Sequence, residues 1–253
     1  MRRWVADGRG WSGELTDDWC QGRAAFGGWM VAGAVGVMEA VVPEGRLCRS
    51  LLTSFVGPVK PGPVVARPLV LRSGRSLTHV EVKVWQDDTV RAVVLGAFGT
   101  TRSPAPGFEG LPAPEVMAVG KAQPMPFLPG LTPAFTQHFE YRWTNGAMPF
   151  TGASDPHVQG WCRPRFPSGG VGLIAALSDA WPPPIWTTLT RPAAGSSVTW
   201  QLDVLRPRAA ADWWLYDART VAAREGYTDF VGALWTEAGE LVATSRQCFA
   251  AYL

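Results

Sequence analysis

The segment SGGVGLIAALSDAW at residues 168–181, which is followed by Pro182, has the pattern of a short buried helix. Its apolar residues recur at helical spacing, with Leu173, Ala176 and Leu177 on one side. The two glycines suit a close approach of the backbone at the start of that helix, and the proline stops it. We therefore predict a helix within this segment.

The first half of the chain carries the same pattern. Phe26-Gly27-Gly28 precedes the apolar segment WMVAGAVGVMEAVV, and Pro43 follows it. Strand-like runs follow each copy, separated by turn residues, at residues 50–62, 64–74, 76–86 and 89–101 and again at residues 196–207, 213–225, 227–235 and 240–253. This internal repeat predicts an α+β fold in which each half is one long helix followed by an antiparallel meander. We expect the two halves to lie side by side with their sheets joined edge to edge.

The composition suggests where the two copies are divided. Residues 104–133 are rich in proline and glycine, as in PMPFLPGLTP, which is typical of a linker. The strand-like run FTQHFEYRW follows directly. We therefore expect an N-terminal domain at residues 1–103, a linker at residues 104–133 and a C-terminal domain at residues 134–253.

Composition and charge exclude several classes of function. The chain has 253 residues, of which 47% are hydrophobic and 17% charged, and this balance is typical of a globular protein. The net charge of +2 comes from scattered basic residues, which argues against a nucleic-acid partner. No apolar run is long enough to span a membrane, and we expect no signal peptide. The four separated cysteines favour a reduced cytoplasmic protein without a metal, and we expect no cofactor.

The order and spacing of short motifs resemble the acyl-CoA thioesterase II family over nearly the whole chain. The motifs that carry this resemblance are Phe26-Gly27-Gly28, Ser54-Phe55, Leu71-Arg72-Ser73-Gly74-Arg75-Ser76, Leu177-Ser178-Asp179, Leu205-Arg206-Pro207, Asp212-Trp213-Trp214-Leu215, Leu234-Trp235 and Leu241-Val242-Ala243-Thr244-Ser245-Arg246-Gln247. The resemblance implies a double hotdog, in which two fused hotdog domains each have a long helix wrapped by an antiparallel sheet and the two sheets join into one.

The resemblance also implies an activity and a site. Members hydrolyse an acyl-CoA to a free acid and CoA, with an Asp on the second helix, a Thr or Ser on the next strand and a Gln near the end of the last strand. In this chain those positions are Asp179, Ser197 and Gln247. Ser197 replaces the Thr of the best-known members and keeps the hydroxyl, and Thr199 or Ser196 supplies it if the register differs by a residue or two.

These residue types suit thioester hydrolysis. An Asp can accept a proton from water as a general base, while Ser and Gln side chains both donate and accept hydrogen bonds and can hold that water. Backbone N–H groups at a helix start can stabilise the oxyanion, and we expect Gly27-Gly28 or Gly169-Gly170 to supply them. The substrate expected is an acyl-CoA or an acyl-carrier thioester, and its phosphates suggest Arg72, Arg75, Arg206 and Arg208 as contacts.

The repeat provides a comparison within the chain. Aligning the two copies places Val37 opposite Asp179, Cys48 opposite Ser197 and Gly96 opposite Gln247. The first copy therefore lacks all three polar groups. We expect only the C-terminal copy to carry out the chemistry.

Other functions stay open at this stage. A hydratase or dehydratase of enoyl or 3-hydroxyacyl thioesters usually needs a His paired with an acid near the central helix, and neither predicted helix contains a His. A non-catalytic acyl-thioester-binding protein would keep the pocket without turnover. We also expect a homodimer or a larger homo-oligomer, because sheet edges need covering.

Overall fold

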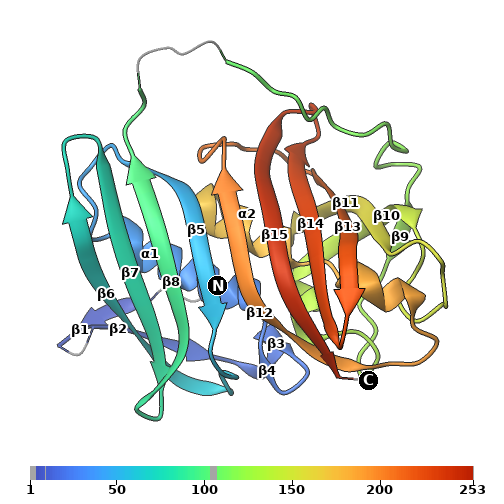
Figure 1. The fold of residues 1–253 in the computed structure, drawn as a ribbon, viewed down its shortest axis with the longest axis horizontal. Helices are drawn as coiled ribbons and strands as arrows, with labels where there is room; N and C mark the ends of the chain where they lie inside the picture. The colour runs from blue at the N-terminus through green and yellow to red at the C-terminus, as the bar shows by residue number, and fades with distance from the viewer. Residues whose placement is uncertain (1–3, 9, 103–106, 253) are drawn as a thin grey trace.

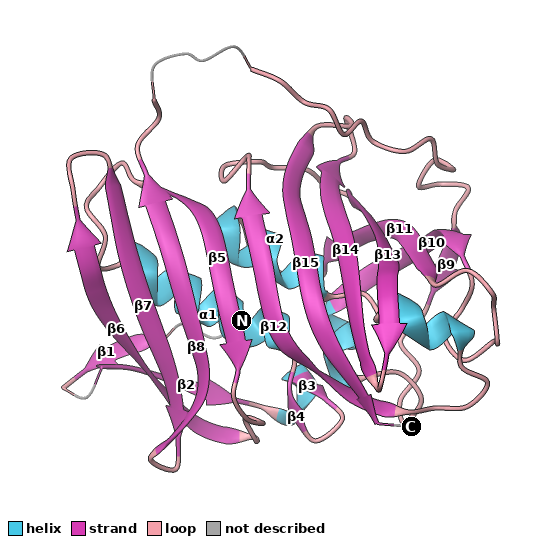
Figure 2. Ribbon diagram, viewed as in Figure 1, coloured by secondary structure: helices cyan, strands magenta, loops and turns pink. Residues whose placement is uncertain are grey.

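Two helices lie on one face of a single large sheet in the computed structural model, which describes residues 4–8, 10–102 and 107–252 (Figure 1). Figure 2 shows both α-helices behind the broad central strands. Within the described residues the main sheet has 13 strands, in the order β1-β2-β6-β7-β8-β5-β12-β15-β14-β13-β11-β10-β9. The two halves thus share one continuous sheet, as the sequence predicted.

The elements follow the repeat. The helices are α1 (Gly27–Glu39) and α2 (Gly170–Asp179), and both begin within the glycine pairs that predicted them. The strands of the first half are β1 (Val5–Asp7), β2 (Gly10–Leu15), β3 (Cys20–Gln21), β4 (Ala24–Ala25), β5 (Leu47–Phe55), β6 (Gly62–Ser73), β7 (Leu77–Gln86) and β8 (Thr89–Gly99). Those of the second half are β9 (Gln123–Met125), β10 (Phe139–Gly146), β11 (His157–Pro164), β12 (Ala194–Val204), β13 (Trp214–Arg224), β14 (Tyr227–Thr236) and β15 (Leu241–Tyr252).

The two helices pack directly against each other in antiparallel fashion. A Cβ added at Gly28 would lie 3.0 Å from the Cα of Ala176, and one added at Gly172 would lie 3.6 Å from the Cβ of Ala32. The start of α1 therefore lies beside the end of α2. This close approach explains why small residues recur on the facing sides of both helices.

The strand order corrects one detail of the predicted meander. In each half the first strand after the helix pairs with the last strand, so that β5 pairs with β8 and β12 pairs with β15. Of the four strands that follow each helix, the last three form the meander. This arrangement leaves β5 and β12 free to pair with each other in the middle of the sheet.

The pairing of β5 with β12 relates the two halves by an approximate twofold axis. Leu52 pairs with Gln201 at its centre, and the Ser50 hydroxyl donates a 2.6 Å hydrogen bond to Asp203 across the seam. The ladder slips after Cys48 in β5 and after Ser197 in β12. These matching bulges support the alignment of Cys48 with Ser197 that the repeat suggested.

The described part of the predicted linker packs against the sheet. The indole N–H of Trp161 donates to the Met117 carbonyl at 2.9 Å, and that of Trp235 donates to the Leu111 carbonyl at 3.3 Å. Apolar residues of the segment join a second, smaller cluster on the sheet around these tryptophans. Residues 107–122 therefore act as a strap, and strand β9 follows inside the expected linker. The boundary expected at residue 103 lies outside the described residues.

Both edges of the sheet are short. The edge strands β1 and β9 have three residues each, and Pro124 in β9 cannot donate a ladder hydrogen bond. Short edge strands and proline protect a sheet from pairing with another chain. Open edges therefore give little support to the expected homo-oligomer, which stays a prediction. Among the described residues no helix is long and apolar enough to cross a membrane.

Candidate active site

Asp179 is the last residue of α2, and its carboxylate lies at the start of α1. One carboxylate oxygen, Oδ2, accepts a 2.7 Å hydrogen bond from the Gly28 N–H. The residue before α1 is Phe26, which has no side chain capable of capping the helix. Asp179 therefore fills the role of an N-cap, bonding the second N–H of a helix that belongs to the other half. The positive end of α1 also compensates for the unfavourable position of an acid at the end of α2.

Gln247 and Ser197 extend this contact into a chain of hydrogen bonds. The Gln247 amide donates from Nε2 to Asp179 Oδ1 at 2.8 Å, and the Ser197 hydroxyl donates to Gln247 Oε1 at 2.8 Å. The hydroxyl thereby fixes the orientation of the amide, because Oε1 is occupied and Nε2 must face the carboxylate. Gln247 is buried, whereas Asp179 and Ser197 are partly exposed. The structure thus brings together all three residues that the resemblance indicated.

The surroundings raise the proton affinity of Asp179. Burial raises the pKa of this carboxyl to about 6, against the opposing effect of the hydrogen bonds from Gln247 and Gly28. A carboxylate with such a pKa is still ionised at neutral pH but accepts a proton more readily than an ordinary Asp. These are the properties that a general base needs.

The two predicted glycine pairs lie in different places. A Cβ at Gly27 would lie 2.7 Å from Asp179 Oδ2 and 3.2 Å from the Phe55 ring, so only glycine leaves room for the carboxylate. Gly169 and Gly170 lie at the start of α2, about 14 Å along the helix from Asp179. The structure brings Gly27-Gly28 to the polar trio and leaves Gly169-Gly170 apart from it.

The alternative hydroxyls do not reach Gln247. Ser196 is exposed, and its hydroxyl lies 3.0 Å from that of Tyr252. Thr199 is exposed and lines a hollow of about 590 Å³ that also includes Leu52 and Leu95. Ser197 is the residue whose hydroxyl bonds the Gln247 side chain.

The arginines suggested for phosphate binding lie at the far end of the strands. Ser197 is near the start of β12, whereas Arg206 and Arg208 follow its end, about 25 Å or more away along an extended strand. Arg206 is also paired with Glu109 and Glu240. Arg72 and Arg75 flank the β6–β7 turn. This turn lies at the end of the sheet where β5 begins, whereas Phe55, the last residue of β5, lies at the opposite end. These four arginines therefore do not surround the trio.

The corresponding place in the first half is apolar. Val37 and Cys48 are fully buried, and the Met38 sulfur would lie 2.6 Å from a Cβ added at Gly96. Burial raises the pKa of the Cys48 thiol to about 12, which keeps it protonated. Packed apolar atoms thus occupy the position that holds the polar trio in the second half.

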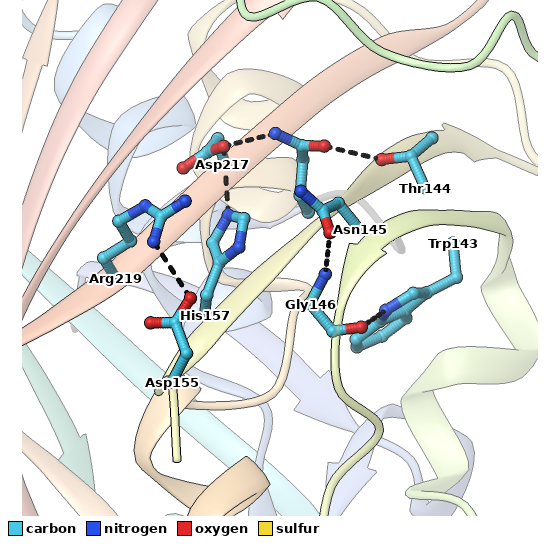
Figure 3. A network of polar contacts seen from close by, with 9 residues as sticks. Trp143, Thr144, Asn145, Gly146, Asp155, His157, Asp217 and Arg219 are labelled. Atoms are coloured by element: carbon cyan, nitrogen blue, oxygen red, sulfur yellow. Dashed lines mark hydrogen bonds and ion pairs between the residues drawn. The ribbon is translucent and has the colours of Figure 1, made fainter. Parts of the chain in front are cut away.

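A second polar network, which the sequence did not reveal, lies between β10, β11 and β13 (Figure 3). Asp217 Oδ2 lies 3.1 Å from His157 Nε2 and accepts a 2.5 Å bond from Gln159, whose Oε1 in turn accepts from Thr144. Burial raises the pKa of Asp217, but the bonds from His157 and Gln159 outweigh it and hold that pKa below its ordinary value. His157 is almost fully buried. A saturated pair of this kind suits a structural role better than proton transfer.

Comparison with known families gives a match in both halves. The family described as acyl-CoA thioesterase N-terminal domain matches residues 15–101, and the one described as acyl-CoA thioesterase C-terminal domain matches residues 119–250. None of the curated proteins matches the sequence.

Solved structures share the fold. A conserved protein of unknown function with a hot dog fold from Alicyclobacillus acidocaldarius superposes with a TM-score of 0.88 at 23% identity, over 99% of this chain and 96% of that one. The acyl-CoA thioesterase II TesB2 of Mycobacterium marinum gives 0.75 at 20% identity, over 96% and 92%. The dehydratase domain of RzxB from Pseudomonas fluorescens gives 0.60 at 12%, over 99% and 97%. The chain therefore has a hotdog fold, which by itself does not choose between these activities.

Proposed function

Because the chain belongs to the acyl-CoA thioesterase family, we propose that it hydrolyses an acyl-CoA or acyl-carrier thioester through Asp179, Ser197 and Gln247. The observation that carries this proposal is the chain of hydrogen bonds that runs from Ser197 through Gln247 to Asp179, beside the start of α1. We further interpret the two halves as two fused hotdog units, of which the C-terminal one supplies the reacting side chains.

In the proposed reaction a water molecule lies against the Asp179 carboxylate and is oriented by Ser197 and Gln247. The water oxygen attacks the thioester carbonyl carbon while its proton passes to Asp179. The carbon–sulfur bond then breaks, and the proton passes on to the thiolate that leaves. A free acid and a thiol result, and the carboxylate is regenerated. General-base assistance of this kind contributes roughly 10²–10⁴-fold to the rate.

The oxyanion is assigned to the start of α1. Asp179 already occupies the Gly28 N–H, so the neighbouring Gly27 N–H is the donor we propose for the carbonyl oxygen. The positive end of the helix favours the developing charge there. The start of α2 lies too far from Asp179 to act on the same thioester.

A hydratase or dehydratase is the alternative function, because a dehydratase domain shares this fold. The described residues do contain an acid–histidine pair, Asp217 and His157, but the histidine is almost fully buried and its acid partner is Asp217, not Asp179. Neither member lies on a helix. This placement favours hydrolysis over water addition or removal at a double bond.

The test is to incubate the protein with acyl-CoAs of increasing chain length and to follow free thiol with a thiol reagent. We expect stoichiometric release of thiol and acid. Ultraviolet absorbance of enoyl-CoA substrates is followed in parallel. A change of absorbance without thiol release would establish the hydratase alternative. Bound acyl-CoA that is never cleaved would establish a binding protein.

A further inference from the structure

Three aromatic side chains form a wall next to Ser197. Phe249 is the cross-strand partner of Ser197, so both side chains point to the same face of the sheet. A Cβ added at Gly195 would lie 2.4 Å from the Phe249 ring, which shows that the ring lies over this glycine. The Trp186 ring packs edge-on against Phe249 at 5.8 Å, and the Phe150 ring lies 5.6 Å from Trp186. The wall therefore starts at the polar trio and extends away from it.

The indole N–H of Trp186 is buried, and no described residue accepts a hydrogen bond from it. The indole N–H groups of Trp85, Trp181 and Trp214 are also unpaired, whereas those of Trp143 and Trp200 donate to the Gly146 carbonyl and the Ser245 hydroxyl at 2.9 Å each. Among the four unpaired indoles of the described residues, Trp186 is the one whose ring packs against Phe249, the cross-strand partner of Ser197. A buried donor without an acceptor is costly and rare in native structures. An unpaired donor beside a proposed reaction site therefore suggests that a ligand provides the acceptor.

The backbone at Phe150 is strained, and hydrogen bonds to the Trp186 segment hold it in place. Phe150 has a φ of 66°, which is rare for a bulky residue. Its N–H donates to the Trp186 carbonyl at 2.7 Å, and the N–H of Ala153 donates to the Thr187 carbonyl at 2.9 Å. Strained residues that the surrounding structure holds in place are concentrated at binding and catalytic sites.

We propose that Phe150, Trp186 and Phe249 form the surface against which the acyl group lies, and that the Trp186 N–H donates to an oxygen carried by that group. The inference rests on the proposed function and deepens it, because it assigns the substrate to oxygen-bearing acyl thioesters. Trp186 is separated from Ser197 by the Phe249 ring. The recognised oxygen is therefore on the acyl chain, some bonds beyond the thioester carbonyl.

The kinetic test compares octanoyl-CoA with derivatives hydroxylated in mid-chain or at the terminal carbon. We expect the wild type to prefer at least one hydroxylated substrate. Trp186→Phe keeps a ring and removes the donor, and should lower that preference, measured as a ratio of kcat/KM, by about fivefold. The matched control is Trp85→Phe, because Trp85 is also partly exposed with an unpaired indole N–H but lies in β7 of the other half. An unchanged ratio in Trp186→Phe would overturn the inference.

A binding experiment separates this inference from the proposed reaction. Non-hydrolysable S-octyl-CoA and its terminally and mid-chain hydroxylated analogues are added to protein labelled with ¹⁵N in its tryptophans. The Trp186 indole signal, assigned by its loss in Trp186→Phe, should shift further with a hydroxylated analogue than with S-octyl-CoA. Equal shifts would refute recognition of an oxygen even if thioesters are hydrolysed. A selective shift in a protein that releases no thiol would keep the recognition and refute hydrolysis.

Discussion

The Asp179 carboxylate accepts a hydrogen bond from the Gly28 N–H, so a residue at the end of one helix caps the start of the other. The sequence placed Asp179 at the end of a helix, where its charge opposes the helix dipole. The antiparallel packing of α1 against α2 changes this balance, because the carboxylate meets the positive end of α1. The proposed base thus owes its position to a contact between the two halves.

Replacing Asp179 by Asn should separate this structural contact from proton transfer. Asn can still accept from the Gly28 N–H and is a good capping residue, but it cannot serve as a base. We expect thiol release to fall by roughly 10²–10⁴-fold. Thermal unfolding should show a protein at least as stable as the wild type at neutral pH. A variant that retains full activity would remove Asp179 from the mechanism.

The pKa of Asp179 predicts how rate and stability change with pH. Since this pKa is about 6, kcat/KM should rise with pH through about 6 and then level off. Stability should change in the opposite direction, because a raised acid pKa means that the folded state binds the proton more tightly than the unfolded state does. This contribution is present below the ordinary Asp pKa and is lost as the pH rises to about 6. Denaturant titrations of the wild type and Asp179→Asn across this range measure it, and parallel curves would contradict it.

Gly27→Ala should damage the site without disturbing the fold. The added methyl would lie 2.7 Å from Asp179 Oδ2 and must displace the carboxylate or the Phe55 ring. Displacement of about 1 Å can lower a rate by about a hundredfold. Gly36→Ala is the matched control on the same helix, because its Cβ would meet nothing within 4 Å. That control should keep its activity and gain roughly 0.5–1 kcal/mol in unfolding free energy. Equal activity of both variants would count against the assigned geometry.

The Ser197 hydroxyl should matter through the orientation of Gln247. Ser197→Ala removes the donor that holds Oε1 and should lower kcat by about tenfold. Ser197→Thr keeps a hydroxyl and should restore most of the rate. The control is Ser196→Ala, because Ser196 is exposed and bonds Tyr252 outside the trio. If Ser196→Ala were the more damaging change, the proposed register of the site would be wrong.

Much of this architecture could be predicted from the repeat. Both glycine pairs mark helix starts, and the turns at Asp87-Asp88 and Glu225-Gly226 have the positive φ angles that tight hairpins require. Local pattern could not show that β5 pairs with β8, because that choice depends on contacts distant in sequence. The trio came from resemblance, since Asp179 and Gln247 are 68 residues apart and no spacing rule joins them.

Other features could not be predicted from the sequence, because they also depend on contacts between residues distant in the chain. The pairing of His157 with Asp217 joins residues 60 positions apart on two strands. The residue pattern of neither strand predicts it. The prolines and glycines of the strap favour extended backbone, so its sequence predicts a linker. Its attachment depends on the indoles of Trp161 and Trp235, whose partners are backbone carbonyls that no side-chain pattern identifies.

The apolar counterpart of the trio, at Val37, Cys48 and Gly96, has a consequence for how the two copies can diverge. A copy that performs no chemistry is constrained only by the volume it must fill, so its inner residues can exchange among apolar types of similar size. This copy must still keep the uncapped start of α1 in contact with the Asp179 carboxylate of the other half. In the proposed mechanism the C-terminal half supplies the reacting side chains, and the N-terminal half supplies the electropositive start of α1 that contacts them.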